Sequence, residues 1–205
     1  MCCRYYILPK GVEWDPIREG AESAGLMRRF REAGLELKSA GELRPADVAP
    51  VLATDRGGGQ SVFPMRWGFR LNGAGRTTLL INARVESAAQ KPCFREAWRA
   101  HRCAVPASWY FEWQQSPERN GTKTKYAIRD EAAPILWLCG LYRIEEGLPV
   151  FVVLTRAPGP RLAEIHDRMP LILPAESIRR WVDPAVRPET LLSGALLELQ
   201  AEKAG

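Results

Sequence analysis

The chain has 205 residues, of which 46% are hydrophobic and 26% charged, and its 29 Lys+Arg against 24 Asp+Glu give a formal net charge of +5. This composition is that of an ordinary soluble globular protein with one core or at most two small ones. No apolar run approaches the ~20 residues that span a bilayer, and the first residues do not form a secretory signal. We therefore expect a cytoplasmic protein with no membrane contact, whose mild basic excess permits a polyanionic partner without proving one.

The five cysteines predict neither a disulfide framework nor a metal site. Their number is odd, no CxxC pair occurs, and the chain has only two histidines, His101 and His166. We expect no metal or other cofactor, and we expect Cys93, Cys103 and Cys139 to be small buried hydrophobic residues.

The first predicted helix covers residues 15–34. Asp15 can cap it, Pro16 suits its first turn, and Gly34 can end it. Apolar residues at helical spacing predict its buried face, namely Ile17, Ala21, Ala24, Met27 and Phe30.

Short stretches rich in β-branched and aromatic residues follow, separated by turn-like segments such as DRGGGQ at 55–60. They predict strands at 48–54, 61–69, 78–85, 102–113, 125–130, 134–144, 150–156 and 169–173. Further helices are predicted at 92–100, 159–166, 175–182 and 188–205. In the last helix Leu192, Ala195 and Leu199 would share one face. Because strands and helices do not alternate regularly, we predict a single α+β domain over residues 1–205, with a mainly antiparallel, curved sheet and peripheral helices.

The chain begins MCCR, so Cys2 follows the initiator methionine. Removal of Met1 would leave Cys2 with an α-amine (pKa of roughly 7.7–8) and a thiol (pKa of roughly 8.5) on one carbon. The amine can condense with an aldehyde to an imine, and the thiolate can then close on the imine carbon to give a five-membered thiazolidine. The alternative is an incidental cysteine at a terminus that tolerates change.

Three polar residues alternate in INARVES: Asn82, Arg84 and Glu86. Alternation in an extended segment would point all three to one side, where they could anchor a phosphate beside a reacting group. The alternative is a surface strand end whose polar residues serve as caps.

Two further residues could transfer protons near neutral pH. Glu112 lies between Phe111 and Trp113, and apolar surroundings would raise the pKa of its carboxyl group, unless it is simply an outward-facing residue of a strand. His166 lies at a helix-to-strand junction, where histidine is either a proton shuttle or a structural residue with satisfied hydrogen bonds.

The segments MCCR, VAP, MRWGF, INARVES, CAVPASWYFEW and IHDRMPLIL occur in this order over most of the chain. This combination resembles the SRAP family, the SOS response-associated peptidase-like proteins. The resemblance implies an α+β fold whose bifurcated antiparallel sheet closes toward a barrel. It also implies a role in DNA damage repair, the covalent capture of abasic sites in single-stranded DNA. The ring-opened sugar there bears the aldehyde that Cys2 would trap, and the stable product would shield the lesion from strand cleavage and error-prone synthesis.

The resemblance also assigns roles to residues. Cys2 is the nucleophile, Asn82 orients the open sugar, and Glu112 and His166 form the proton-transfer pair. The implied DNA contacts are Arg4 and Arg84 to phosphates, Pro50 and Trp67 to bases, and Trp113 to the backbone. We expect a monomer that binds single-stranded DNA and needs no cofactor.

Three departures from the family pattern bear on this expectation. Cys3 replaces the usual glycine, so it could crowd the site or offer a second thiol. ADVAP replaces the usual YNVAP, which puts the contacts around Pro50 in doubt. From about residue 189 the chain looks shorter than the family pattern, without its usual final strand.

Two other functions remain open at this point. In a thiol autopeptidase, Cys2 and His166 would support acyl chemistry and the free amine would be incidental. In a non-covalent single-stranded DNA-binding module, Cys2 would be dispensable and affinity would fall steeply with salt. A lyase activity would also be compatible with covalent capture of abasic sites through Cys2.

Overall fold

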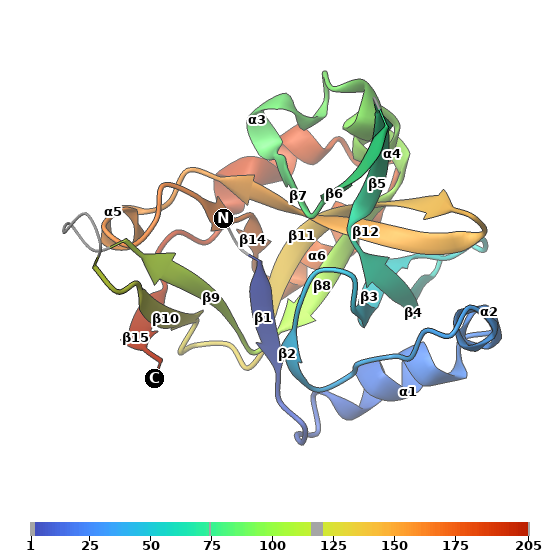
Figure 1. Cartoon of the computed structure of the whole chain (residues 1–205), viewed down its shortest axis with the longest axis horizontal. Helices are drawn as coiled ribbons and strands as arrows, with labels where there is room; N and C mark the ends of the chain where they lie inside the picture. Colours follow the sequence, from blue (N-terminus) through green and yellow to red (C-terminus); the bar gives the residue numbers. More distant parts are fainter. Residues whose placement is uncertain (1–2, 74, 116–120, 205) are drawn as a thin grey trace.

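The computed structural model describes residues 3–73, 75–115 and 121–204. At its centre five strands close into a barrel, and each strand is hydrogen-bonded to the next (Figure 1). In order around the barrel they are β3 (Val48–Thr54), β4 (Gln60–Trp67), β12 (Leu148–Arg156), β11 (Leu136–Glu145) and β8 (Arg102–Ala107). Only the β4–β12 contact of this ring is parallel. The predicted closure of the sheet toward a barrel is confirmed.

Shorter strands extend the barrel where chain segments from distant parts of the sequence meet. β7 (Asn82–Arg84) runs parallel to β12, β13 (Met169–Pro170) pairs with the same strand, and β14 (Ile172–Leu173) pairs with β11. A separate hairpin of β5 (Phe69–Gly73) and β6 (Arg76–Leu80) stands at the upper end of the barrel in Figure 1.

A second, five-stranded antiparallel sheet lies beside the barrel. Its order is β15 (Gln200–Lys203), β10 (Thr124–Arg129), β9 (Trp109–Gln114), β1 (Arg4–Ile7) and β2 (Gly41–Leu43). β9 follows β8 after one residue, Ser108, so a single stretch of chain passes from the barrel into this sheet. The Ser108 N–H donates to the Tyr6 carbonyl (2.7 Å), and the Ser108 Oγ accepts from the Leu8 N–H (2.9 Å), which ties β1 to the bend. The predicted bifurcation of the sheet occurs here, where β8 of the barrel continues into β9 of the second sheet.

The helices surround these sheets. They are α1 (Asp15–Ser23), α2 (Met27–Glu32), α3 (Val85–Ala88), α4 (Pro92–Ala100), α5 (Pro160–Ala163), α6 (Ala175–Val182) and the 3₁₀ helix η1 (Pro188–Gly194). In the part of the chain that the structure describes, no helix is long and apolar enough to cross a membrane.

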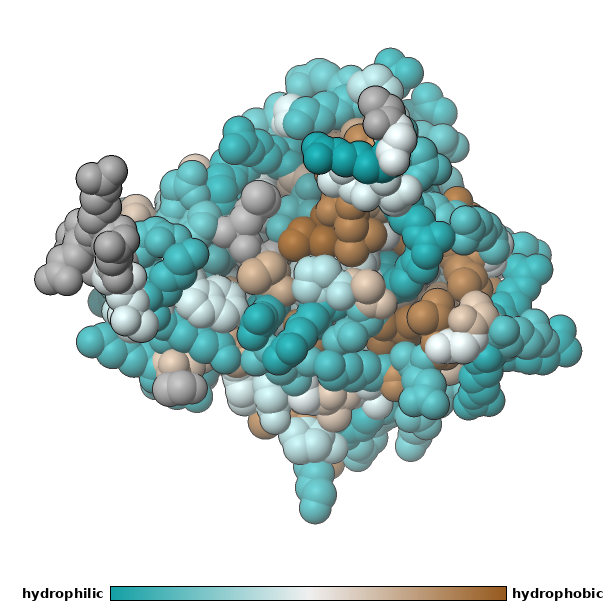
Figure 2. Space-filling model, in the orientation of Figure 1, coloured by the Kyte–Doolittle hydropathy of each residue, from teal (hydrophilic) through white to brown (hydrophobic). Residues whose placement is uncertain are grey.

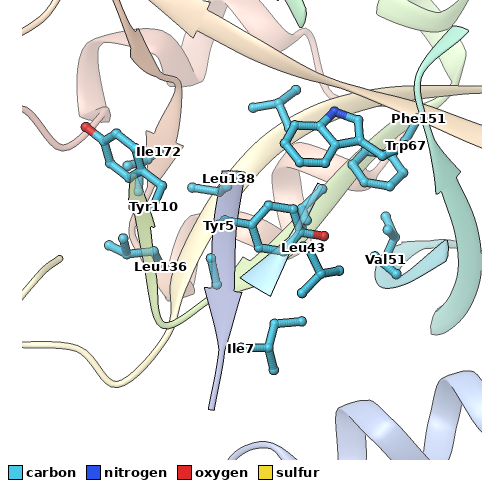
Figure 3. Close-up of a cluster of buried hydrophobic side chains, with 14 of the residues drawn as sticks. Tyr5, Ile7, Leu43, Val51, Trp67, Tyr110, Leu136, Leu138, Phe151 and Ile172 are labelled. Carbon is cyan, nitrogen blue, oxygen red and sulfur yellow. The ribbon is translucent and has the colours of Figure 1, made fainter. Parts of the chain in front are cut away.

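The larger apolar core fills the space between the barrel and the five-stranded sheet (Figure 3). Trp67 is fully buried there, with its ring 5.3 Å from that of Tyr5 and 6.0 Å from that of Phe151. A second core lies under α4 and α6 and contains the edge-on pair Trp98 and Trp181. Of the cysteines expected to be buried, Cys103 and Cys139 are, whereas Cys93 is only partly buried.

Two helix predictions are wrong in a way that follows from tertiary context. The 15–34 helix is divided at Ala24, whose ψ of 131° is extended, so α1 and α2 form separately around Gly25. Asp15 does not cap α1; its carboxylate pairs with Arg18 instead. The faces Ile17/Ala21 and Met27/Phe30 are nevertheless buried as expected.

The end of the chain is also not a helix beyond Gly194. After η1 it forms β15, in which Gln200–Lys203 pair antiparallel with β10. The last described residues therefore include a strand where the sequence predicted a helix. The spacing of Leu192, Ala195 and Leu199 resembled a helix, but the open edge of β10 provides hydrogen-bond partners that a local pattern does not reveal.

A buried arginine holds the second core together. Arg102 is 1% exposed, and its guanidinium lies 5.7 Å from the Trp181 ring. It donates to the backbone carbonyls of Trp98, Arg99, Trp181, Asp183 and Val186. These carbonyls lie at the C-terminal ends of α4 and α6 and in the segment after α6, where a cation satisfies orphaned acceptors and complements the helix dipoles.

We predict that Arg102→Met lowers the free energy of unfolding by more than about 3 kcal/mol, because several buried carbonyls lose their donor together. Chemical denaturation followed by circular dichroism measures this. Arg95→Met, at an exposed position of α4, is the matched control and should change stability by less than about 0.5 kcal/mol. Equal stability of the two variants would show that the hydrogen bonds of Arg102 do not stabilise the second core.

Candidate functional site

A pocket of about 320 Å³ opens where β1 and β9 meet the segment after α5. Its wall is formed by Cys3, Arg4, Glu112, Trp113, Gln115, Lys123 and His166. Four residues that the sequence singled out, Arg4, Glu112, Trp113 and His166, are thus brought together from three distant segments. Cys2 lies outside the described residues, and its neighbour in the chain, Cys3, is part of the wall.

Strand pairing places Cys3 beside Glu112. Arg4 of β1 is opposite Phe111 of β9, so Cys3 approaches the next residue of β9, Glu112. Burial, and secondly the nearby Glu112 carboxylate, raise the pKa of the Cys3 thiol. Cys3 therefore stays protonated near neutral pH and is a poor nucleophile, because the thiolate is the reactive form.

Glu112 is 2% exposed, and this burial raises the pKa of its carboxyl group to about 7. The expected rise is confirmed, but the aromatic neighbours in the sequence do not cause it. Side chains alternate along a strand, so Phe111 and Trp113 project to the opposite face from Glu112. The desolvation comes from the inner face of the sheet, where Tyr126 of β10 is directly opposite Glu112.

His166 lies between α5 and β13, where hydrogen bonds to nearby backbone groups hold it. Its N–H donates to the Leu162 carbonyl (3.0 Å), and its Nδ1 accepts from the Arg168 N–H (3.0 Å). In this neutral form the proton is on Nε2, which is then the donor of the ring. The Asp167 Oδ1 lies 2.8 Å from the same Nδ1, so a second proton there would have to replace the Arg168 contact. Burial lowers the pKa of His166 and favours the neutral ring.

Two sets of contacts fix the His166 segment relative to the sheets. The Gln114 Nε2 of β9 donates to the Glu164 carbonyl (2.8 Å), which joins this segment to the strand that carries Glu112. The Arg168 guanidinium makes a two-pronged pair with Glu86 (2.8 Å for each N–O contact) and donates to the Thr155 carbonyl (2.6 Å). His166 is thereby tied to both sheets and to α3.

Asn82 and Arg84 lie near this arrangement but not in the pocket wall. Both are in β7, where Asn82 is opposite Val153 and Arg84 is opposite Thr155 of β12. Arg84 is exposed and Asn82 partly buried. The expectation that Glu86 continues their alternation is wrong, because helix α3 begins at Val85 and directs Glu86 toward Arg168.

Pro50 and Trp67, which the resemblance assigned to base contacts, are buried in barrel strands. The Trp67 Nε1 donates to the Ile81 carbonyl (2.9 Å), one residue before Asn82, while its ring packs on Tyr5, next to Arg4. In this structure Trp67 therefore supports β1 and β7 from below and presents no ring surface to a base.

The mouth of the pocket is cationic and aromatic. Arg4 lies with its guanidinium carbon 5.2 Å from the centre of the Trp113 ring and pairs with Glu42 at 3.0 Å. Sequence reasoning missed Gln115 and Lys123, which flank residues 116–122, because nothing local distinguishes them from other turn residues. Within the described residues, no group of three or more His, Cys, Asp or Glu side chains could hold a metal ion.

This chain is similar to known proteins over most of its length. The family model described as SOS response associated peptidase (SRAP) matches residues 1–204. Abasic site processing protein YoaM of Bacillus subtilis is 30% identical over 175 residues, which are 79% of this chain and 76% of YoaM. Abasic site processing protein YedK of Escherichia coli is 32% identical over 143 residues, 66% of this chain and 63% of YedK.

Solved structures show the same fold at lower sequence identity. A phage-related protein from Bordetella bronchiseptica superimposes with a TM-score of 0.74 at 22% identity, over 99% of this chain and 94% of that one. A protein from Bacteroides thetaiotaomicron gives a TM-score of 0.72 at 21% identity, over 98% and 91% of the two chains. From the match over residues 1–204 and the shared architecture, this chain belongs to the SRAP family.

Proposed function

We propose that this protein processes abasic sites in single-stranded DNA by forming a covalent thiazolidine through the amine and thiol of Cys2, after Met1 is removed. The relatives named as abasic site processing proteins support the substrate class. The observation that carries the mechanism is the pairing of Glu112, with a pKa of about 7, and neutral His166 in one pocket whose wall includes Cys3.

The reaction needs no external reagent. The α-amine of Cys2 adds to the aldehyde carbon of the ring-opened sugar, and the resulting hydroxyl group leaves as water, which leaves an imine. The sulfur then adds to the imine carbon, and the nitrogen takes up the proton that the thiol loses. One C–N bond and one C–S bond form, and one water molecule is released. Ring closure is intramolecular, so it is strongly favoured.

The pocket residues supply proton transfer. Protonated Glu112 donates a proton to the departing hydroxyl group, which a carboxyl group with an ordinary pKa could not do near pH 7. The Nε2–H of His166 donates to the sugar oxygen as the ring opens. Arg4 and Lys123 at the mouth bind the phosphates beside the lesion, and Asn82 and Arg84 on the neighbouring β7 hold the sugar and the next phosphate.

We predict that the wild-type protein forms a band on a denaturing gel with single-stranded DNA carrying one abasic site, and that Cys2→Ala forms none. Alanine at position 2 still permits removal of Met1 and keeps the amine, so this variant makes only an imine that hydrolyses. Adding borohydride should restore a band for Cys2→Ala by reducing that imine.

Cys3→Ala is the matched control, because it changes the adjacent thiol and leaves the reacting residue intact. It should form the band as the wild type does. A stable band from Cys2→Ala without reductant, or from protein whose intact mass still includes Met1, would contradict the mechanism. Release of an engineered N-terminal extension without any DNA band would favour the thiol peptidase instead.

The rate of crosslinking should depend on pH with a maximum between about 7 and 8. It rises as the Cys2 amine, with a pKa of roughly 7.7–8, becomes neutral, and it falls as Glu112 loses its proton above about 7. Glu112→Gln should lower the maximal rate about 100-fold and abolish the falling limb. Single-turnover gel assays from about pH 5.5 to 9 measure this, and Glu96→Gln, on the exposed face of α4, is the control.

The same variant tests the burial of Glu112 independently of DNA. Because the folded-state pKa of Glu112 is raised from 4.5 to about 7, its ionisation lowers stability as pH rises through this range. Going from about pH 4.5 to 8, Glu112→Gln should gain up to about 3 kcal/mol of unfolding free energy relative to the wild type. A stability difference that does not change with pH would mean that the folded protein does not raise the pKa of Glu112.

The Arg168–Glu86 pair should affect the rate of crosslinking because it positions His166. Arg168→Lys keeps the charge but loses the two-pronged contact, so we expect crosslinking to slow about tenfold. In a His166→Ala background the same change should cost little more, because the two residues act as one unit. Equal effects of Arg168→Lys with and without His166 would contradict this coupling.

A further inference from the structure

The five-stranded sheet has an outward face that the proposed chemistry does not use. Residues directly opposite each other in antiparallel strands point to the same side. Tyr6 is opposite Trp109, and Trp113 is opposite Lys125, while Arg4 and Ala127 flank Phe111. This side of β1 and β9 therefore carries four aromatic residues, which we call the aromatic face: Tyr6, Trp109, Phe111 and Trp113.

The rings of the aromatic face form a continuous line. Tyr6 and Trp109 are stacked, with centroids 4.4 Å apart and an interplanar angle of 4°. Phe111 lies 6.5 Å from Trp109 on one side and 6.5 Å from Trp113 on the other. Along β9 the line extends for about 13 Å, at roughly 3.3 Å per residue. Trp113 also belongs to the pocket wall, so the line begins at the site itself.

Cations lie over these rings. The Lys125 Nζ is 3.9 Å from the Phe111 centroid and 5.9 Å from that of Trp113, which Arg4 also covers at 5.2 Å. Strand register and ion pairs place four cationic residues on this side, Arg4, Arg44, Lys125 and Arg129, against two carboxylates, Glu42 and Glu202. The face is therefore positive.

The helices leave this face accessible. α1 packs on β3 and β4, and α4 and α6 pack on β8 and β11. Tyr6, Trp109 and Trp113 remain partly exposed, whereas Phe111 is only 6% exposed and lies beneath Lys125. Figure 2 shows a mixture of pale and teal side chains over β1 and β9, without the brown of an aliphatic patch. Protein-binding surfaces have a core depleted of charged residues, whereas here two of the four rings, those of Phe111 and Trp113, carry a Lys or Arg.

We propose that the aromatic face binds two or three unpaired bases of the strand whose lesion occupies the pocket. This inference rests on the proposed function. Bases stack on partly exposed aromatic rings whatever their sequence, and neighbouring Lys and Arg contact the phosphates between them. Beyond Trp109 the face ends at a pocket of about 550 Å³, lined among others by Leu8, Trp109 and Arg129, which gives the last base room to turn out of the stack. β9 thus presents the reacting carboxyl group on one face and the binding surface on the other.

The test measures equilibrium binding of lesion-free, fluorescently labelled DNA by anisotropy, with single strands of about 6 and about 20 nucleotides and a duplex of the longer length. Trp109→Ala should raise Kd for the longer single strand about tenfold, and Trp109→Phe, which keeps a ring, should recover most of this. Lys125→Gln should raise Kd a few-fold and reduce the slope of log K against log salt by about 1. Melting temperatures verify that each variant is folded.

The controls are Ile144→Ala and Arg28→Gln, at exposed positions in the β11–β12 hairpin and in α2. Both should bind the longer strand as the wild type does. Unchanged Kd values for Trp109→Ala and Lys125→Gln would overturn the proposal, as would an equal loss for the duplex, which has no free base faces. Crosslinking of a lesion-bearing strand by the wild type, measured in parallel, tests the proposed function separately. If no crosslink forms while Trp109→Ala weakens lesion-free binding, the aromatic face stands and the covalent mechanism fails.

Discussion

The burial of one carboxyl group, that of Glu112, is the constraint on which the rest of the site depends. An ionised carboxylate is costly in a poorly solvated position, so the proton is retained to about pH 7. That position exists because β9 faces the barrel across a filled apolar core, in which Tyr5 and Trp67 pack beneath the start of β1. The raised pKa of Glu112 therefore depends on the arrangement of the two sheets and not on the residues beside Glu112 in the sequence.

The bend at Ser108 explains how one stretch of chain serves both sheets. β8 closes the barrel against β3 and β11, and β9 continues it into the five-stranded sheet, where it receives β1 and β10. Ser108 donates to the Tyr6 carbonyl and accepts from the Leu8 N–H, which ties β1 and the residue after it to the bend. The N-terminal nucleophile that we propose needs such a fixed approach, because chain ends are otherwise poorly ordered.

The alternation of side chains along β9 separates two tasks. Tyr110 and Glu112 point inward, toward the core and His166, while Trp109, Phe111 and Trp113 point outward with Lys125 and Arg4 over them. A single strand thus combines a dry environment, which the proposed acid catalysis requires, with a cationic and aromatic surface on its other side. The ties from Gln114 to Glu164 and from Arg168 to Glu86 keep the histidine beside the inward face without covering the outward one.

The sequence by itself determined the positions of the barrel strands, the turn at 55–60, the helices at 92–100 and 175–182, and four of the residues that line the pocket, because alternation, turn residues and motif order are local properties. It did not locate β1, β2, β5 or β15. Only the tertiary structure decided what each segment pairs with. Residues 188–203 contain a 3₁₀ helix and a strand because the edge of β10, about 70 residues earlier, is open. Glu86 lies in α3 and not in the strand, and it pairs there with Arg168. Trp67 is buried in the core and not exposed at the surface. Hydrogen-bond partners and burial are set by residues distant in the chain, and no local spacing records them.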